Sequence, residues 1–211
     1  MKLSRKPMKK VFFNDYVFYI LENVYEPAED TFLLADNLRV NENDFVLDMG
    51  TGCGILGILA AKKARWVIAV DINPYAVCCA KMNAKFNGVE RKMNILQGDF
   101  FQPIKKDGKF DLILFNAPYL PSEKEEQKTW IEKAWAGGLC GRELIDGFLF
   151  EAPKRLRVDG RVFLLQSTLS EVDKTMRTFE GAGLQAKVIA EKKVAFETIV
   201  VIEARSHKRS I

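Results

Sequence analysis

The sequence predicts one α/β domain with a mostly parallel sheet, helices on both faces and an antiparallel hairpin at one edge. From about residue 45 onward, β-branched apolar runs alternate with stretches of helical periodicity. This alternation is typical of parallel sheets, whose strands are joined by crossover helices. The last two strand-like runs, 186–190 and 197–203, are separated by only six residues. Because that gap is too short for a crossover helix, these two strands should form an antiparallel hairpin.

The individual elements follow from local signals along the chain. The apolar run 45–49 ends at a glycine-rich turn, and the small apolar residues after it have the spacing of a helix packed on a sheet. Pro74 opens the next helix, since proline fits the first helical position. Seven strands are expected, at 45–49, 66–71, 93–97, 110–115, 161–166, 186–190 and 197–203. Helices are expected at 55–64, 74–86, 141–156 and 169–180.

Length and composition exclude several classes of protein. The 211 residues are 48% hydrophobic and 28% charged, which suits one sizeable core. The four cysteines form no C-x-x-C pair and the lone His207 lies in a charged tail, so we expect no metal site. No run is long enough for a signal peptide or a membrane span. We therefore expect a protein of the reducing cytoplasm.

Basic residues are concentrated at the two ends of the chain. The net charge of +4 is small, and much of the basic excess lies in the first ten and last seven residues. Such ends can contact RNA or a ribosome-associated partner, but solvated, partly frayed termini are the favoured interpretation. We expect an N-terminal extension at 1–23, one domain at 24–205 and a basic tail at 206–211.

A glycine-rich turn after the first strand indicates a ligand site. Gly50, Gly52 and Gly54 allow the backbone to bend sharply and to approach a ligand without a Cβ clash. In open α/β sheets, ligands bind outside the carboxyl ends of the strands. The segment 52–57 also matches the dinucleotide fingerprint Gly-x-Gly-x-x-Gly, which alone is a weak signal. Asp48 would repel a pyrophosphate but suits the ammonium group of S-adenosylmethionine.

Further acidic residues follow the second and third strands. Asp71 ends the second strand, where a carboxylate can accept hydrogen bonds from both ribose hydroxyls of a nucleoside. Asp99 can accept from an adenine amino group, and Phe100 can line the ring, although Asp99 can also be a simple turn residue. Together with Asp48, these residues favour S-adenosylmethionine over a dinucleotide.

The fourth strand ends in Asn116-Ala117-Pro118-Tyr119, which suits methylation of a planar nitrogen. The lone pair of an amide or exocyclic amine is delocalised, which makes the nitrogen a poor nucleophile. The Asn116 oxygen and a main-chain carbonyl at Ala117 can accept its two N–H groups, while Tyr119 stacks on the flat group. Held in this way, the nitrogen is aligned with a sulfonium methyl. We take these four residues as the catalytic motif.

Two further segments carry a resemblance to a known protein family. Residues 24–34 contain Tyr-Glu-Pro-Ala-Glu-Asp-Thr, and residues 134–143 contain Ala-Trp-Ala-Gly-Gly. With the motifs above, they closely resemble the HemK/PrmC-related glutamine methyltransferases of the archaeal and eukaryotic branch. The resemblance spans about 24–150 and implies the Rossmann-like, seven-stranded sheet of class I methyltransferases. This chain departs from the family's Asn-Pro-Pro-Tyr motif at Ala117.

The resemblance also implies a substrate, a partner and site residues. The family methylates the side-chain amide nitrogen (N5) of the glutamine in the Gly-Gly-Gln motif of translation termination (release) factors. Its members often act with a small zinc-containing activator subunit of the Trm family. The resemblance places cofactor-binding residues at Thr31, Asp48, Gly50, Asp71, Asp99, Phe100 and Asn116.

Two other functions remain open on the sequence. The same Asn-x-Pro-Tyr chemistry serves N6-adenine methylation of RNA or DNA, but no basic, aromatic-lined groove is evident beyond the charged ends. A non-catalytic subunit that binds S-adenosylmethionine would be favoured by loss of Asn116 or Asp71, and both are present. We expect no membrane association.

Overall fold

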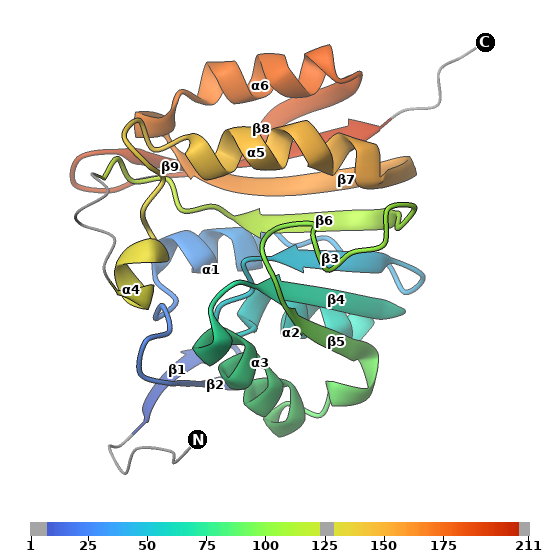
Figure 1. Ribbon diagram of the computed structural model, residues 1–211, viewed down its shortest axis with the longest axis vertical. Coiled ribbons are helices and arrows are strands. Elements are labelled where there is room, and N and C mark those ends of the chain that lie inside the picture. The colour runs from blue at the N-terminus through green and yellow to red at the C-terminus, as the bar shows by residue number, and fades with distance from the viewer. Residues whose placement is uncertain (1–7, 123–128, 207–211) are drawn as a thin grey trace.

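A computed structural model describes residues 8–122 and 129–206. The seven predicted strands form one sheet of order β5-β4-β3-β6-β7-β9-β8 (Figure 1). The first five strands in this order are parallel, whereas β9 runs antiparallel to both β7 and β8. The strand bounds are β3 Phe45–Met49, β4 Trp66–Asp71, β5 Met93–Gln97, β6 Phe110–Asn116, β7 Leu156–Ser167, β8 Leu184–Lys193 and β9 Thr198–Ser206. The predicted parallel sheet with an antiparallel edge is confirmed.

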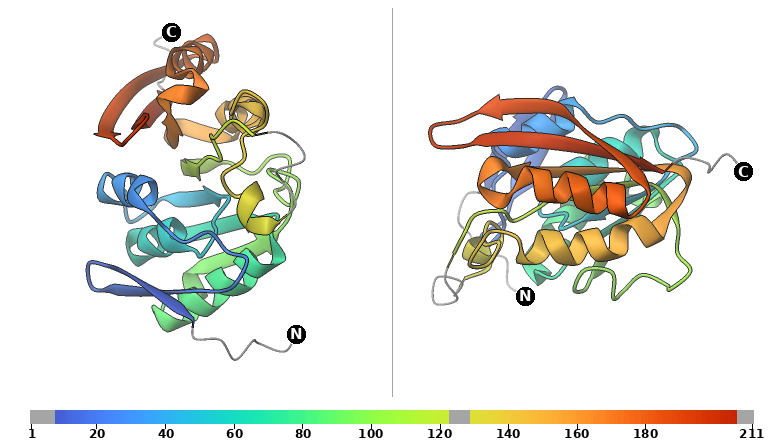
Figure 2. Two further views of the ribbon diagram at one scale, coloured as in Figure 1. Left: turned by 90° about the vertical axis from the view of Figure 1, so that its left-hand side faces the viewer. Right: turned by 90° about the horizontal axis from the view of Figure 1, so that it is seen from above.

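Helices cover both faces of this sheet (Figure 2). Alternate strand residues point to opposite faces, so Leu112 and Leu114 pack in one core whereas Ile113 and Phe115 pack in the other. The first core lies against α1 (Glu29–Asp36), α2 (Ile55–Lys63) and α3 (Pro74–Phe86), and the second against α5 (Glu143–Glu151) and α6 (Val172–Gly181). None of the helices in the part of the chain described here has the length and apolar character needed to cross a bilayer.

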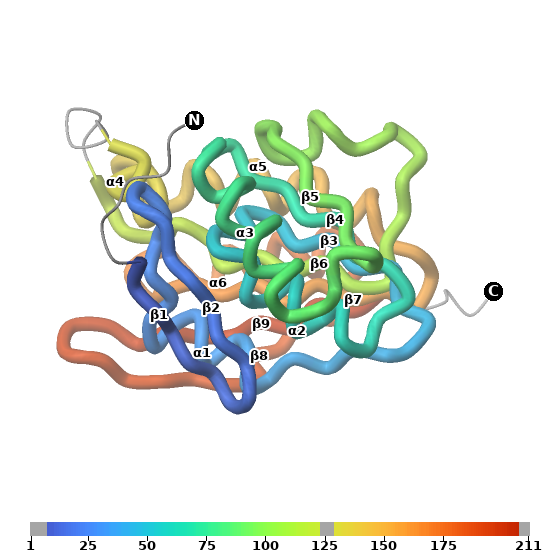
Figure 3. Tube along the Cα trace, turned by 90° about the horizontal axis from the view of Figure 1, so that it is seen from below, coloured from blue at the N-terminus to red at the C-terminus, as the bar shows by residue number. Residues whose placement is uncertain are grey.

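An N-terminal hairpin was not predicted from the sequence. Strands β1 (Lys9–Phe13) and β2 (Tyr16–Ile20) form a separate two-stranded sheet that lies against α3 (Figure 3). The fully buried Asn83 of α3 holds this hairpin, since its amide nitrogen donates to Tyr19 O at 2.8 Å and its oxygen accepts from Tyr19 N at 2.9 Å. The same nitrogen donates to Cys53 O at 2.8 Å. The hairpin is therefore bound to the glycine-rich turn through one side chain.

Several predicted boundaries are corrected by the structure. The helix expected at 141–156 ends at residue 151, because Pro153 has no N–H to continue it. The strand expected at 161–166 begins at Leu156, with a bulge opposite Phe110 and Leu112. The helix expected from residue 169 begins at Val172, because Glu171 has a φ of 53°. A short helix, α4 (Trp130–Lys133), was not predicted.

The structure describes the two terminal segments only in part. The basic tail expected at 206–211 lies outside the described residues, apart from Ser206, which ends β9. The first seven residues of the expected N-terminal extension also lie outside them.

Candidate active site

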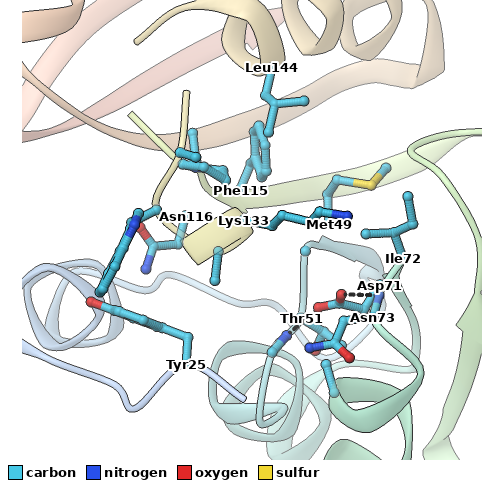
Figure 4. A pocket seen from close by; sticks show the side chains of 18 of the residues that line it. Tyr25, Met49, Thr51, Asp71, Ile72, Asn73, Phe115, Asn116, Lys133 and Leu144 are labelled. Carbon is cyan, nitrogen blue, oxygen red and sulfur yellow. Dashed lines mark hydrogen bonds between the residues drawn. The ribbon is translucent and has the colours of Figure 1, made fainter. Parts of the chain in front are cut away.

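A cavity of about 380 Å³ opens at the carboxyl ends of β3, β4 and β6 (Figure 4). It is bounded by the glycine-rich turn, the start of α1, the loop after β6 and the short helix α4. Ten of the predicted site residues line it, namely Thr31, Gly50, Gly52, Asp71, Asp99, Phe100, Asn116, Ala117, Pro118 and Tyr119. Asp48 and Gly54 do not line it. The sheet thus brings together residues that are far apart in the sequence.

The glycine-rich turn is joined to the next strand by hydrogen bonds. Gly50 and Gly52 have φ values of 63° and 58°, which other residues rarely adopt. Gly52 N donates to Asp71 Oδ2 at 2.8 Å, and Asn73 N donates to Asp71 Oδ1 at 2.9 Å. Asp71 also lines the cavity, where its carboxylate can accept from a further donor. Burial raises the pKa of Asp71, because the surroundings solvate its charge poorly.

Asp48 lies beneath this turn, with 1% of its surface exposed. Its Oδ2 accepts from Thr51 Oγ1 at 2.5 Å and from Gly57 N at 2.9 Å. Burial raises the pKa of Asp48 to about 7, and the nearby charge of Asp71 adds to the shift. Through these contacts Asp48 stabilises the glycine-rich turn, and its side chain does not line the cavity. The sequence had predicted that this carboxylate would face the ammonium group of the ligand.

Gly54 also acts away from the cavity. It has a φ of 91° at the start of α2, and a Cβ there would lie 3.1 Å from the Cβ of Ala80. The residue therefore permits close packing of α2 against α3, which fixes the direction in which the turn enters the helix.

Asp99 and Phe100 reach the cavity from the loop after β5. Asp99 is exposed and lines the cavity, as the sequence interpretation requires of an acceptor for a ligand. Phe100, with a φ of 45°, packs edge-on against Phe115 at a centroid distance of 5.9 Å. This contact holds the Phe100 ring in the cavity wall.

Asn116 is held by α1 and leaves its oxygen free. Its Nδ2 donates to Thr31 Oγ1 at 3.0 Å and lies 3.4 Å from Asp30 Oδ2. Its Oδ1 is buried and has no hydrogen-bond partner among the residues described. An unsatisfied buried acceptor is costly in a folded protein, and in a cavity wall it is suited to a ligand N–H. This side chain can therefore accept a hydrogen bond from a substrate nitrogen.

Backbone hydrogen bonds hold the loop after β6 against the Ala-Trp-Ala-Gly-Gly segment. Leu120 N donates to Trp135 O at 3.0 Å, and Gly137 N donates to Leu120 O at 2.8 Å. Gly141, with a φ of 69°, passes so close to Tyr119 O that a Cβ could not fit between them. Because Gly141 has no side chain, the backbone here can pack directly against the catalytic motif.

Within the motif, Ala117 and Tyr119 are both well packed. Ala117 is 3% exposed, and its N–H donates to Leu165 O at 3.3 Å, a hydrogen bond that a proline at this position would lack. Burial raises the pKa of Tyr119, and the charge of Asp30 adds to the shift, so the phenol stays protonated.

Sequence reasoning missed part of the cavity wall. Trp130, Lys133 and Trp135 line the cavity from α4 and the segment after it. A capping box starts this helix, with Thr129 N donating to Glu132 Oε2 at 2.6 Å, and the Thr-x-x-Glu pattern is a signal that could have revealed it. Arg142 is fully buried and binds Asp146 at 2.6 Å, so it stabilises the α5–α6 region.

Comparisons with known proteins agree with this geometry. The family model of the methyltransferase small domain matches residues 25–194. A Methanocaldococcus jannaschii protein that carries the provisional name protein N5-glutamine methyltransferase is 44% identical over 86% of this chain and 91% of its own length. Methyltransferase HEMK2 of Mus musculus is 32% identical over 85% of this chain and 88% of its own.

A solved structure has the same fold. The Mtq2–Trm112 complex of E. cuniculi, described as responsible for methylation of the eRF1 translation termination factor, contains a chain that superposes with a TM-score of 0.67 at 25% identity. The match covers 87% of this chain and 99% of that chain.

Proposed function

Because the chain belongs to the methyltransferase small domain family, we propose that it transfers a methyl group from S-adenosylmethionine to a glutamine side-chain amide of a translation termination factor. The acceptor glutamine in this proposal is that of a Gly-Gly-Gln motif. The relatives named above support it, since one carries the name of a protein N5-glutamine methyltransferase and another methylates eRF1.

The residues of the cavity fit S-adenosylmethionine as the methyl donor. The cofactor supplies an electrophilic methyl group on a sulfonium sulfur. Asp71 can accept from ribose hydroxyls, Asp99 offers an acceptor for an adenine amino group, and Phe100 offers a flat apolar surface. The turn at Gly50 and Gly52 brings the backbone into the same wall. In this assignment Asp48 acts through the turn that it braces.

The single observation that carries the proposal is the unpaired oxygen of Asn116. Its nitrogen is bound by Thr31, which leaves the buried oxygen as the group without a partner among the described residues. A primary amide presents two N–H groups in one plane, and this oxygen would accept one of them. Tyr119 lies three residues further in the same wall and would contact the flat amide. Orientation of this kind provides much of the catalysis, and no nucleophilic side chain is needed.

We further propose that the chain acts with a small activator subunit, like the Trm112 partner of the E. cuniculi protein. In this arrangement the catalytic chain holds the donor and the glutamine, while the partner contributes to docking or stability.

The test uses labelled methyl donor with the protein, with and without such an activator. Three acceptors are compared: the host termination factor, the same factor with the Gly-Gly-Gln glutamine replaced by alanine, and host RNA. The proposal predicts label in the intact factor only. Label confined to RNA would overturn it in favour of adenine methylation, and equal labelling of the alanine variant would place the methyl group on another residue. Donor binding without transfer to any of the three would indicate a non-catalytic subunit.

A further inference from the structure

A chain of hydrogen bonds runs from Tyr25 through the start of α1 to Asn116. The Tyr25 hydroxyl lies 3.1 Å from each oxygen of Asp30. Thr31 donates to Asp30 Oδ1 twice, from its N at 2.5 Å and from its Oγ1 at 3.1 Å. Asn116 Nδ2 then donates to Thr31 Oγ1 at 3.0 Å. Asp30 and Thr31 are 7% and 3% exposed, so water competes little for these contacts.

The direction of every hydrogen bond in this chain is set by Asp30. An ionised carboxylate can only accept, so Tyr25 and Thr31 must both donate to it. Burial and the charge of Asp30 raise the pKa of Tyr25, which keeps its proton on the phenol. The Thr31 hydroxyl donates its one proton to Asp30. Its oxygen can therefore only accept a hydrogen bond from Asn116.

We propose that Asp30 is a positioning residue that fixes the orientation of the Asn116 amide. The nitrogen of Asn116 is directed to α1, and the oxygen is left for the acceptor nitrogen of the substrate. This inference rests on the proposed role of Asn116 as a hydrogen-bond acceptor and names the residue that enforces it.

The alternative orientation of the amide shows why such a residue is needed. The two ends of an asparagine amide have nearly the same shape, so packing alone distinguishes them poorly. A rotation that exchanges them would bring Asn116 Oδ1 to the place 3.4 Å from Asp30 Oδ2, where two acceptors repel each other. It would also turn an NH₂ group toward the N–H groups of the substrate amide. The negative charge of Asp30 therefore selects the productive orientation.

The substitution Asp30→Asn tests this directly, because it keeps the shape and removes the charge. Thr31 N can only donate, so the oxygen of the new amide must stay at the Oδ1 position, 2.5 Å away. The new NH₂ group then occupies the Oδ2 position and faces Asn116 Nδ2. Two donors in contact favour rotation of Asn116, and Thr31 Oγ1 can then donate to the rotated oxygen. The variant therefore reverses the hydrogen bond between Thr31 and Asn116 and keeps the one from Thr31 N.

We expect Asp30→Asn to lower kcat for methyl transfer about 10- to 100-fold, since misdirected positioning groups cost factors of this size. The donor Kd should stay within about threefold of the wild-type value. Asp36→Asn is the matched control, because Asp36 is exposed at the other end of α1 and the substitution makes the same charge change. It should transfer at the wild-type rate. Thr31→Ser should retain transfer and Thr31→Val should lose it, since only serine keeps the hydroxyl.

Nuclear magnetic resonance measures the orientation of the Asn116 amide directly. In the wild-type protein, the side-chain NH₂ protons of Asn116 should give nuclear Overhauser contacts to Thr31, and these contacts should be lost in Asp30→Asn. A kcat within threefold of wild type, or persistence of these contacts in the variant, would overturn the inference. If the wild-type protein transfers nothing to the termination factor, the proposed function fails. The nuclear Overhauser measurement still decides whether Asp30 orients Asn116.

Discussion

Asn116 and Thr31 are 85 positions apart in the sequence, and yet the side-chain nitrogen of one lies 3.0 Å from the hydroxyl of the other. This contact joins the end of β6 to the first turn of α1 and leaves the Asn116 oxygen without a hydrogen-bond partner among the described residues. The start of α1 therefore forms part of the wall of the candidate site.

Gly141→Ala should disturb the catalytic motif more than the fold. A Cβ at this position would meet Tyr119 O, and the φ of 69° adds strain of about 1 kcal/mol. The displaced loop would move the residues that contact substrate, so we expect kcat to fall about tenfold or more. Gly147→Ala is the control, because this glycine of α5 has open space around it. Steady-state transfer rates should show the loss in the first variant and not in the second.

The pH dependence of stability should depend on Asp48. Its pKa is raised to about 7 in the folded protein, so between about pH 4 and pH 7 the folded state holds the proton that the unfolded state has lost. Stability from this group is therefore lost as pH rises through that window. The free energy of unfolding of Asp48→Asn, relative to wild type, should increase by about 2–3 kcal/mol between pH 5 and pH 8. Urea unfolding at both pH values measures this difference, and a constant difference would contradict the assignment.

Asn83→Ala should loosen the N-terminal hairpin. The change removes the partner of the part-buried Tyr19 N–H and of the Cys53 C=O, and it leaves the Tyr19 C=O with the Cys79 thiol as donor. We expect a loss of about 2–4 kcal/mol in the free energy of unfolding. Amide exchange in β1 and β2 should become faster. Asn94→Ala, at an exposed position of β5, should change neither quantity.

The buried sheet was predictable because its signals are local. Runs such as Phe45–Met49 and Trp66–Asp71 are apolar and end at polar or glycine residues, and the structure has these strands at the expected positions. The hairpin at residues 9–20 was missed although its signal is local, since two runs of aromatic and β-branched residues flank the turn formers Asn14 and Asp15. Its attachment to α3 depends on Asn83, a residue more than 60 positions away. No local pattern encodes such a contact.

In the candidate site, too, the features with local sequence signals were predicted and those that depend on distant contacts were not. Its glycines, acids and catalytic motif were found because each follows a strand and carries a recognisable residue type. The depth of Asp48 beneath the turn was not predictable, since the direction of its side chain depends on Thr51 and Gly57. Likewise, the wall formed by α4 depends on how a loop folds back over the cavity, which residue type alone does not specify.

The central claim is that the Asn116 oxygen holds the nitrogen that is methylated. Asn116→Ala removes that oxygen and leaves Asp71 and the glycine-rich turn unchanged. Single-turnover transfer to the termination factor, measured beside calorimetric binding of S-adenosylmethionine, tests the claim most directly. We predict a loss of transfer of about 100-fold or more, with a donor Kd within about threefold of wild type. Transfer at a rate within threefold of wild type would contradict the account.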